Sequence, residues 1–278
     1  VGRMRDEPFD LAVLMTDSFL SALVAWRGAA RRRVGYVGQG RGLLLTDRLH
    51  PQRWNGRRVQ EPMVDYYSRL AETVGCPAES RQLELHTTEA DRQAADAAWR
   101  DLGLRDDGRV IALNTSGVHG SARLWPVEHF GLLARRIVAT LDHDVLVTCG
   151  PKERRVAREV VRHGGSNRVF SMADQPLGIG VAKACIAKCR LMVSNDSGPR
   201  HIAAALGKPV VTLFGPMLPV WSENPTQQAS NLYVDLDCIG CNKQTCPLGH
   251  HRCMRELSVD MVYHAMIRLM ESTARVAA

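Results

Sequence analysis

The sequence has 278 residues, of which 45% are hydrophobic and 23% are charged, a composition typical of a folded globular protein. This length predicts two domains, each able to bury its own core. The sequence has no run of about eighteen apolar residues, and its opening VGRMRDEPFD lacks the apolar core of a secretory signal. We therefore expect neither a membrane-spanning helix nor a signal peptide, and we expect a cytoplasmic protein.

The formal net charge of +7 is concentrated near the amino end. Residues 1–60 contain eleven arginines against five aspartates and glutamates, an excess of six positive charges. Such a basic segment favours an anionic partner, for which a phosphorylated glycan, an anionic lipid surface and a nucleic acid are all open. A solvated arginine-rich face is the alternative interpretation.

Taken in chain order, six short apolar segments predict β-strands. They are separated by segments with helical patterns and read DLAVLM (10–15), RVGYV (33–37), RVIALN (109–114), DVLVTCG (144–150), RLMVSN (190–195) and PVVTLFG (209–215). Continuous apolar strands that alternate with helices are typical of parallel sheets covered on both faces. The sequence therefore predicts an α/β fold.

Two of the intervening helices carry clear signals at their ends. In segment 87–104, Thr88 is the expected N-cap and Gly103 lies near the end. In segment 125–141, Pro126 suits the first helical position. The apolar residues of this second segment recur at helical spacing and are expected to face a core: Val127, Phe130, Leu133, Ala134, Ile137, Val138 and Leu141.

A polar break at residues 105–108 divides the predicted elements into two domains. Residues 1–104 are expected to form a partial Rossmann-like domain, residues 105–257 a second one, and residues 258–278 a final helix. Only two or three strands precede the break, and a parallel sheet that small would leave a long unpaired edge. We therefore expect the first domain to be truncated, or to be completed by a partner or an atypical supplement.

The segment Asn-Asp-Ser-Gly-Pro at 195–199 follows a predicted strand and opens a predicted helix. Ligands of open α/β sheets bind at such positions, where a helix N-terminus offers free N–H groups. Gly198 allows a close backbone approach, Asp196 and Ser197 can bond to ribose or sugar hydroxyls, and His201 projects from the first turn. The alternative is that Asp196 or Ser197 caps the helix and His201 is a surface residue.

The segment 114–130, NTSGVHGSARLWPVEHF, follows the first strand of the same domain. Small residues in its loop can place backbone N–H groups around phosphate oxygens, and Arg123 supplies positive charge. These small residues are Ser116, Gly117, Gly120 and Ser121. The loop is neither a P-loop nor a GxGxxG turn, and a flexible surface loop is the alternative interpretation.

Four of the eight cysteines cluster near the carboxyl end, at Cys238, Cys241, Cys246 and Cys253. Four thiolates at this spacing can enclose a structural zinc ion, with His250 or His251 able to replace one ligand. Reduced or partly oxidised cysteines are the alternative. The remaining four are expected to be buried thiols: Cys76, Cys149, Cys185 and Cys189.

Together these motifs resemble glycosyltransferase family 9, the lipopolysaccharide heptosyltransferases. The resemblance rests on the loop that ends in Arg-Leu-Trp-Pro at 123–126 and on NDSGPRHIAAALGKP at 195–209. Residues 10–46 are also similar to the later part of the family's amino-terminal domain, and residues 238–262 resemble its Cys-rich segment. This resemblance covers most of the chain.

The resemblance implies a GT-B fold, in which two Rossmann-like domains face a cleft. It implies an inverting, metal-independent enzyme that moves heptose from ADP-heptose or a related nucleotide sugar to an anionic lipopolysaccharide core, with peripheral contact at the inner membrane. The nucleotide sugar would bind the second domain at nine positions: Ser116, Gly120, Ser121, Arg123, Asn195, Asp196, Ser197, Gly198 and His201. No nucleic-acid partner is expected, because the sequence shows no recognised motif for one.

The sequence departs from the family in one respect. Family members open with Gly-x-x-Gly-Asp, whose aspartate would activate the acceptor hydroxyl, and this sequence contains no such motif. Asp17, which follows the predicted strand DLAVLM, is the nearest carboxylate at the carboxyl end of a strand. It matches a different strand of the family, so we do not assign it the role of the base, and the catalytic residue is unknown. A nucleotide-sugar-binding module, or a degenerate transferase without a base, is therefore the alternative function.

Overall fold

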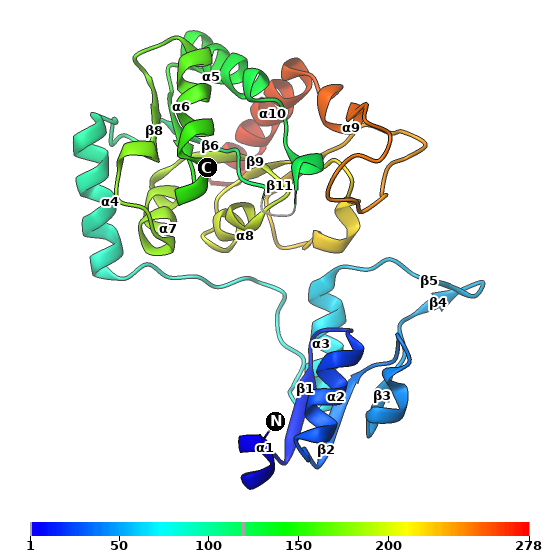
Figure 1. Ribbon diagram of the computed structural model, residues 1–278. Helices are drawn as coiled ribbons and strands as arrows, with labels where there is room; N and C mark the ends of the chain where they lie inside the picture. Colours follow the sequence, from blue (N-terminus) through cyan, green and yellow to red (C-terminus); the bar gives the residue numbers. More distant parts are fainter. Residues whose placement is uncertain (1, 118–119, 278) are drawn as a thin grey trace. The chain divides into compact units, whose positions relative to one another are not determined.

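Figure 1 shows the computed structural model, which describes residues 2–117 and 120–277. The chain divides into two compact units. The first comprises Val1–Arg81 and Val220–Pro225, and the second comprises Gln82–Pro219 and Thr226–Ala278. The division at residues 81 and 82 lies earlier than the expected boundary at 104 and 105, because helix α4 (Glu89–Leu102) packs into the core of the second unit.

A three-stranded parallel sheet forms the centre of the first unit, in the order β1-β2-β3. Tyr36 on β2 and Tyr66 on α3 stack with their ring centroids 3.7 Å apart, beside Val34 and Leu70. The elements of this unit are α1 (Gly2–Asp6), β1 (Leu11–Leu14), α2 (Phe19–Arg27), β2 (Arg32–Tyr36), η1 (Arg41–Leu44), β3 (Asp47–Leu49), β4 (Arg53–Trp54), β5 (Arg57–Arg58) and α3 (Met63–Thr73).

Six parallel strands form the sheet of the second unit, in the order β11-β10-β9-β6-β7-β8. They are β6 (Val110–Asn114), β7 (Asp144–Thr148), β8 (Val169–Ser171), β9 (Leu191–Asn195), β10 (Val210–Leu213) and β11 (Ala229–Leu232). The sequence predicts four of them. It misses β8 and β11, because VFS and ASNL are too short or too polar to form an apolar run.

Helices cover both faces of this sheet, with α5, α6 and α10 on one face and α4, α7 and α8 on the other (Figure 1). The predicted α/β class, with two Rossmann-like sheets, is therefore confirmed. The helices are α5 (Val127–Leu141), α6 (Arg154–Gly164), α7 (Ile179–Lys188), α8 (Gly198–Ala205), α9 (Arg252–Arg255) and α10 (Val259–Ala277). Short 3-10 turns are η2 (Ser121–Arg123), η3 (Pro151–Glu153), η4 (Met172–Asp174) and η5 (Pro219–Ser222).

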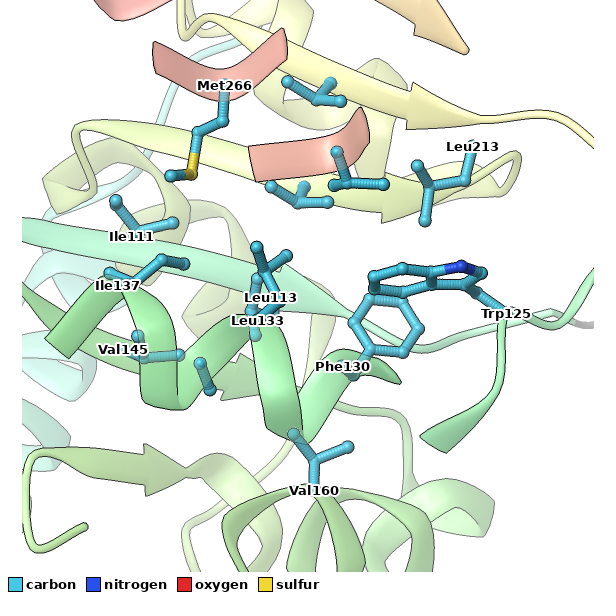
Figure 2. Packing of buried hydrophobic residues seen from close by; sticks show 14 of the residues in the cluster. Ile111, Leu113, Trp125, Phe130, Leu133, Ile137, Val145, Val160, Leu213 and Met266 are labelled. Carbon is cyan, nitrogen blue, oxygen red and sulfur yellow. The ribbon is translucent and has the colours of Figure 1, made fainter. Parts of the chain in front are cut away.

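The larger core lies between the sheet and α5, α6 and α10, and Figure 2 shows it from close by. Ile111 and Leu113 of β6 contact the α5 side of this core, where Phe130, Leu133 and Ile137 are all fully buried. The predicted apolar stripe of α5 is thus confirmed. Burying side chains of this size contributes about 1.5–3 kcal/mol each.

The ends of the helices follow the sequence signals closely. The Thr88 hydroxyl accepts from Asp91 N at 3.2 Å, and the Asp91 carboxylate accepts from Thr88 N at 3.0 Å, forming a capping box. Gly103 ends α4 at a φ of 68°. Pro126 is the N-cap of α5 rather than its first helical residue.

The prediction that four isolated cysteines are buried is wrong for Cys76, which is exposed. Cys76 follows α3 and Gly75, which has a φ of 96°, and it lies in the exposed segment 75–82. Cys185 and Cys189 are buried as expected, and Cys149 is half-buried.

Candidate functional site

The order of strands in the six-stranded sheet reverses between β6 and β9. The sheet extends from β6 through β7 and β8 on one side, and from β9 through β10 and β11 on the other (Figure 1). All six strands are parallel, so the loops that follow β6 and β9 leave the same edge in opposite directions. This is the switch point at which open α/β sheets bind ligands. The predicted segments at 114–130 and 195–201 start there.

Asn114 ends β6 and connects the two strands at the switch point. It is only 1% exposed, and its amide donates to Ser194 Oγ and Ser197 Oγ, each at 2.9 Å. Its Oδ1 accepts from Ser116 N at 3.4 Å. Ser197 has the N-cap position of α8 but makes no side-chain capping bond, so the interpretation that it only caps the helix is wrong.

The Asp196 carboxylate lies between two arginines. Arg123, from η2, donates to Asp196 Oδ2 at 3.3 Å, and Arg200, from the first turn of α8, donates to Asp196 Oδ1 at 3.1 Å. Arg200 is 2% exposed, and burial lowers the pKa of its guanidinium despite the nearby carboxylate. Asp196 therefore ties the loop after β6 to the helix after β9.

Asn195 braces the same loop from inside. It is fully buried; its Oδ1 accepts from Trp125 N at 3.1 Å, and its Nδ2 donates to Thr115 O at 3.0 Å. The Trp125 indole in turn donates to Leu257 O at 2.8 Å. Both functional groups of Asn195 thus fix the loop that carries Arg123.

The loop after β7 adds a carboxylate to the site. The Ser116 hydroxyl donates to Glu153 Oε2 at 2.7 Å, and the same oxygen accepts from Gly150 N at 2.8 Å. Thr148 ends β7 and is buried beside this network. Glu153 thereby joins β6 to β7 as Asp196 joins β6 to β9, and its carboxylate can accept from a hydroxylated ligand.

The N-terminus of α8 opens onto free space. A Cβ atom at Gly198 would meet no protein atom within 4 Å, and the backbone there does not require glycine. A group that approaches this backbone would be close to the positive end of the helix dipole. His201 is exposed in the first turn, and desolvation by neighbouring atoms together with the Arg200 charge lowers its pKa to about 4. His201 is consequently neutral near pH 7.

An apolar cavity of about 430 Å³ adjoins this polar network. Its polar edge contains Asn114, Ser116 and Thr148, while its remaining wall is largely apolar and comes from the loop after β7 and from α7 and α8: Cys149, Gly150, Pro151, Leu177, Gly178, Ile179, Ala182, Ile186, Gly198, Pro199 and Ile202. This volume is typical of small-molecule sites. The site thus combines an apolar slot with hydroxyl partners and a helix N-terminus.

A comparison with known protein families identifies the family of the chain. Residues 2–252 match the family described as glycosyltransferase family 9 (heptosyltransferase). The chain belongs to glycosyltransferase family 9. The resemblance based on segments 123–126 and 195–209 is confirmed.

Curated relatives of this family 9 chain are named as heptosyltransferases. Lipooligosaccharide heptosyltransferase 2 of Campylobacter jejuni serotype O:2 is 29% identical over 62% of this chain and 54% of its own length. The Haemophilus ducreyi protein of the same name is 28% identical over 97% of this chain and 79% of its own. Lipopolysaccharide heptosyltransferase 2 of Escherichia coli is 24% identical over 96% and 77%. The chain spans about half the length of the Campylobacter relative.

Solved structures of family 9 proteins share the fold. The E. coli ADP-heptose lipopolysaccharide heptosyltransferase II has a TM-score of 0.70 at 21% identity, over 98% of this chain and 80% of its own. The family 9 glycosyltransferase of Veillonella parvula has a TM-score of 0.75 at 20% identity, over 98% and 76%. These likenesses place the family 9 chain in the GT-B class.

The Cys-rich segment of this family 9 chain packs against the Arg123 loop. Ala122 N donates to Gln244 O at 3.0 Å, and a Cβ at Gly120 would lie 2.2 Å from the same oxygen. The His251 ring nitrogen Nε2 lies 2.8 Å from Ala122 O. The structure therefore gives Gly120 a packing role that the loop sequence alone did not indicate, while Ser121 beside it is exposed.

The four cysteines of this segment are all free thiols. Across residues 2–117 and 120–277, no three or more His, Cys, Asp or Glu side chains are grouped so that they could hold a metal ion. The geometry thus does not support the expected structural zinc, which stays a prediction.

Sequence reasoning missed Asn114, Glu153 and Arg200. The glycine-proline turn after a buried strand, GPKE at 150–153, was the available signal for Glu153. Arg200 gave none, because an arginine in the first turn of a helix is ordinarily exposed. Val118 and His119 of the predicted loop lie outside the described residues.

In the first unit, Asp17 forms the centre of a separate cluster. Its carboxylate accepts from the Tyr66 hydroxyl at 2.9 and 2.8 Å and from Arg41 Nη2 at 2.9 Å, with Arg58 at 3.8 Å. Burial and Asp17 together raise the pKa of Tyr66. Arg41 is fully buried, so one of the eleven arginines of residues 1–60 serves the fold rather than a partner.

In the described part of the chain, no helix combines the length and apolar character needed to cross a membrane.

Proposed function

We propose that this chain takes part in the transfer of a heptose, or a related sugar, from a nucleotide diphosphate donor to a lipopolysaccharide-core glycan. The second unit would bind the donor at the β6–β9 switch point. The single observation that carries the proposal is the Arg123–Asp196 pair beside the open N-terminus of α8 and the apolar cavity. The names of the curated relatives support the sugar and the acceptor.

In this proposal the parts of the donor match the parts of the site. The base would enter the apolar cavity between α7 and α8, and ribose hydroxyls would donate to Glu153. The diphosphate would face Arg123 and the backbone at Gly198. A similar fold supports a nucleotide diphosphate as ligand: E. coli heptosyltransferase WaaC, solved with ADP, has a TM-score of 0.63 at 16% identity.

The proposed reaction is a single displacement with inversion. An acceptor hydroxyl oxygen attacks the anomeric carbon, the bond from that carbon to the phosphate oxygen breaks, and its electron pair leaves with the nucleotide diphosphate. Arg123 and the α8 N-terminus would stabilise the charge that grows on the leaving oxygen. His201, neutral near pH 7, would act there through a hydrogen bond rather than through a charge. The acceptor proton requires a base that the described residues do not identify.

For the acceptor we propose an anionic glycolipid that meets the first unit at the membrane surface. Exposed arginines such as Arg27 and Arg48 would supply the attraction. Arg31, Arg32 and Arg41 are already paired with carboxylates of the same unit, so the available positive charge is smaller than the sequence count.

Titration calorimetry with ADP tests the donor site. Arg123→Ala removes a charge-assisted contact worth about 1.5–3 kcal/mol, so the Kd for ADP should rise roughly 10- to 150-fold. Arg162→Ala, exposed in the last turn of α6 at the other end of the sheet, should bind as the wild type does. Equal affinity of the Arg123→Ala and Arg162→Ala proteins would refute the site.

Product analysis separates an enzyme from a binding module. The chain is incubated with ADP-heptose and a heptose-deficient lipopolysaccharide core, and the released ADP and the glycan mass are measured. Release of ADP together with a glycan one heptose heavier supports the transferase. Tight ADP binding without either product would leave the nucleotide-sugar-binding module as the function of this chain.

A further inference from the structure

A second cavity lies at the opposite edge of the six-stranded sheet. Because the strands are parallel, their amino ends share one edge, and each of four strands is immediately preceded there by a polar segment: Arg109 before β6, His143 before β7, Arg190 before β9 and Lys208-Pro209 before β10. These residues line a cavity of about 860 Å³, together with Gln228 before β11 and Met270 and Thr273 of α10. It is therefore separate from the switch-point site.

The charges around this cavity are unevenly paired. Lys188 contacts Asp96 at 2.7 Å and Asp106 at 3.1 Å, and Arg109 contacts Asp142 at 2.9 Å. Asp107 is the carboxylate in the lining, and Arg105 holds it at 2.8 Å.

Two further cations in the same lining, Arg190 and Lys208, have no carboxylate partner among the residues that the structure describes. Lys208 is half-buried, and Arg190 is exposed. Burial, and to a lesser extent the Arg190 charge, lower the pKa of the Lys208 ammonium. Two neighbouring cations without a counter-charge destabilise each other, and an anion between them would relieve both.

Two other polar side chains lie in the lining of the cavity. The His143 nitrogen Nδ1 donates to Leu141 O at 2.6 Å, so Nε2 carries a hydrogen for a ligand only when the ring is an imidazolium. Gln228 is exposed and carries a side-chain amide. Guanidinium, ammonium and amide donors around one hollow match the oxygens of a phosphoryl group.

We propose that this cavity binds a soluble, phosphate-bearing small molecule, with its phosphate between Arg190 and Lys208. The volume is that of a small-molecule site and exceeds what inorganic phosphate alone would fill. The site is independent of the donor site, since it shares no residue with it.

The test is an NMR titration with pyrophosphate on the full chain, in which amide shifts near Gly198 report the donor site and shifts near Arg190 report this cavity. Backbone amide shifts at Arg190, Lys208 and Gln228 that saturate at constant ionic strength are expected. The double variant Arg190→Gln, Lys208→Gln should bind pyrophosphate at least about tenfold more weakly, and Arg162→Gln should bind as the wild type does. Unchanged ADP affinity of each variant shows that its fold is intact. The single variant Lys208→Gln is measured as well, because it is a milder change than the double variant.

Three results would overturn the proposal. The first is a failure of the proposed position: the shifts occur only near Gly198, or the double variant binds pyrophosphate as tightly as the wild type does. The second is that citrate binds as tightly as pyrophosphate, which would show a general anion patch. The third is that Arg190 and Lys208 govern sedimentation with phosphatidylglycerol vesicles while pyrophosphate has no effect, which would assign the phosphate to a lipid surface.

Discussion

Arg200, almost fully buried in the first turn of α8, donates its Nε to Asp196 Oδ1 at 3.1 Å. The same carboxylate accepts from Arg123, so the residue proposed to face the donor phosphates is held by a second, hidden cation. Because Arg200 is buried and holds the carboxylate that Arg123 also contacts, we expect it to act as a positioning residue for Arg123.

We predict that Arg200→Met lowers the free energy of unfolding by about 2–3 kcal/mol. This is less than the cost of removing the only partner of a buried carboxylate, because Asp196 still accepts from Arg123. Adding Asp196→Asn should restore part of that loss, since it removes a buried carboxylate that is left with one cationic partner in place of two. Urea denaturation of both variants measures this. A double variant less stable than Arg200→Met would contradict the role given to the pair.

Gly120 and Gly198 are predicted to behave in opposite ways when changed to alanine. At Gly120 the new Cβ would lie 2.2 Å from Gln244 O at a φ of 105°, so the variant should lose about 3 kcal/mol of stability. At Gly198 the space is open, so the stability of the alanine variant should stay within about 1 kcal/mol of the wild type. Its ADP binding should weaken at least about tenfold, because the added methyl group blocks the approach of phosphate to the backbone. Paired denaturation and calorimetry check both, and normal ADP affinity of Gly198→Ala would contradict the proposed phosphate position.

Four strands of the six-stranded sheet, β6, β7, β9 and β10, were predictable from the sequence, because they are continuous apolar runs. The two polar loops were predictable too, because runs such as RVIALN and RLMVSN end in residues that cannot be buried unpaired. The meeting of these loops was not, since it depends on β6 and β9 being neighbours, a fact of strand order that local patterns do not contain. Asn195 shows the same limit: its place in the motif suggests a ligand contact, while its hydrogen bonds brace the loop.

His201 should make stability depend on pH. Its pKa is 6.5 in an unfolded chain and about 4 in the folded one, so between these values the unfolded state takes up a proton that the folded state does not. The stability linked to this group is therefore complete above pH 6.5 and is lost as the pH falls toward 4. His201→Asn should flatten the fall of the urea midpoint across that window relative to the wild type. Identical slopes for His201→Asn and wild type would show that His201 is not responsible.

Cys149 should resist alkylation although it lines the donor cavity. Burial, with a smaller effect from Glu153, raises the pKa of its thiol to about 11, so little of the reactive thiolate exists at pH 8. With limiting iodoacetamide at that pH, mass spectrometry of the digested protein should find the exposed Cys76 modified well before Cys149. Raising the pH to 10 should accelerate modification of Cys149, and saturating ADP should slow it again, because the proposed base position covers the thiol. Modification of Cys149 that ADP does not change would place the nucleotide outside the cavity between α7 and α8.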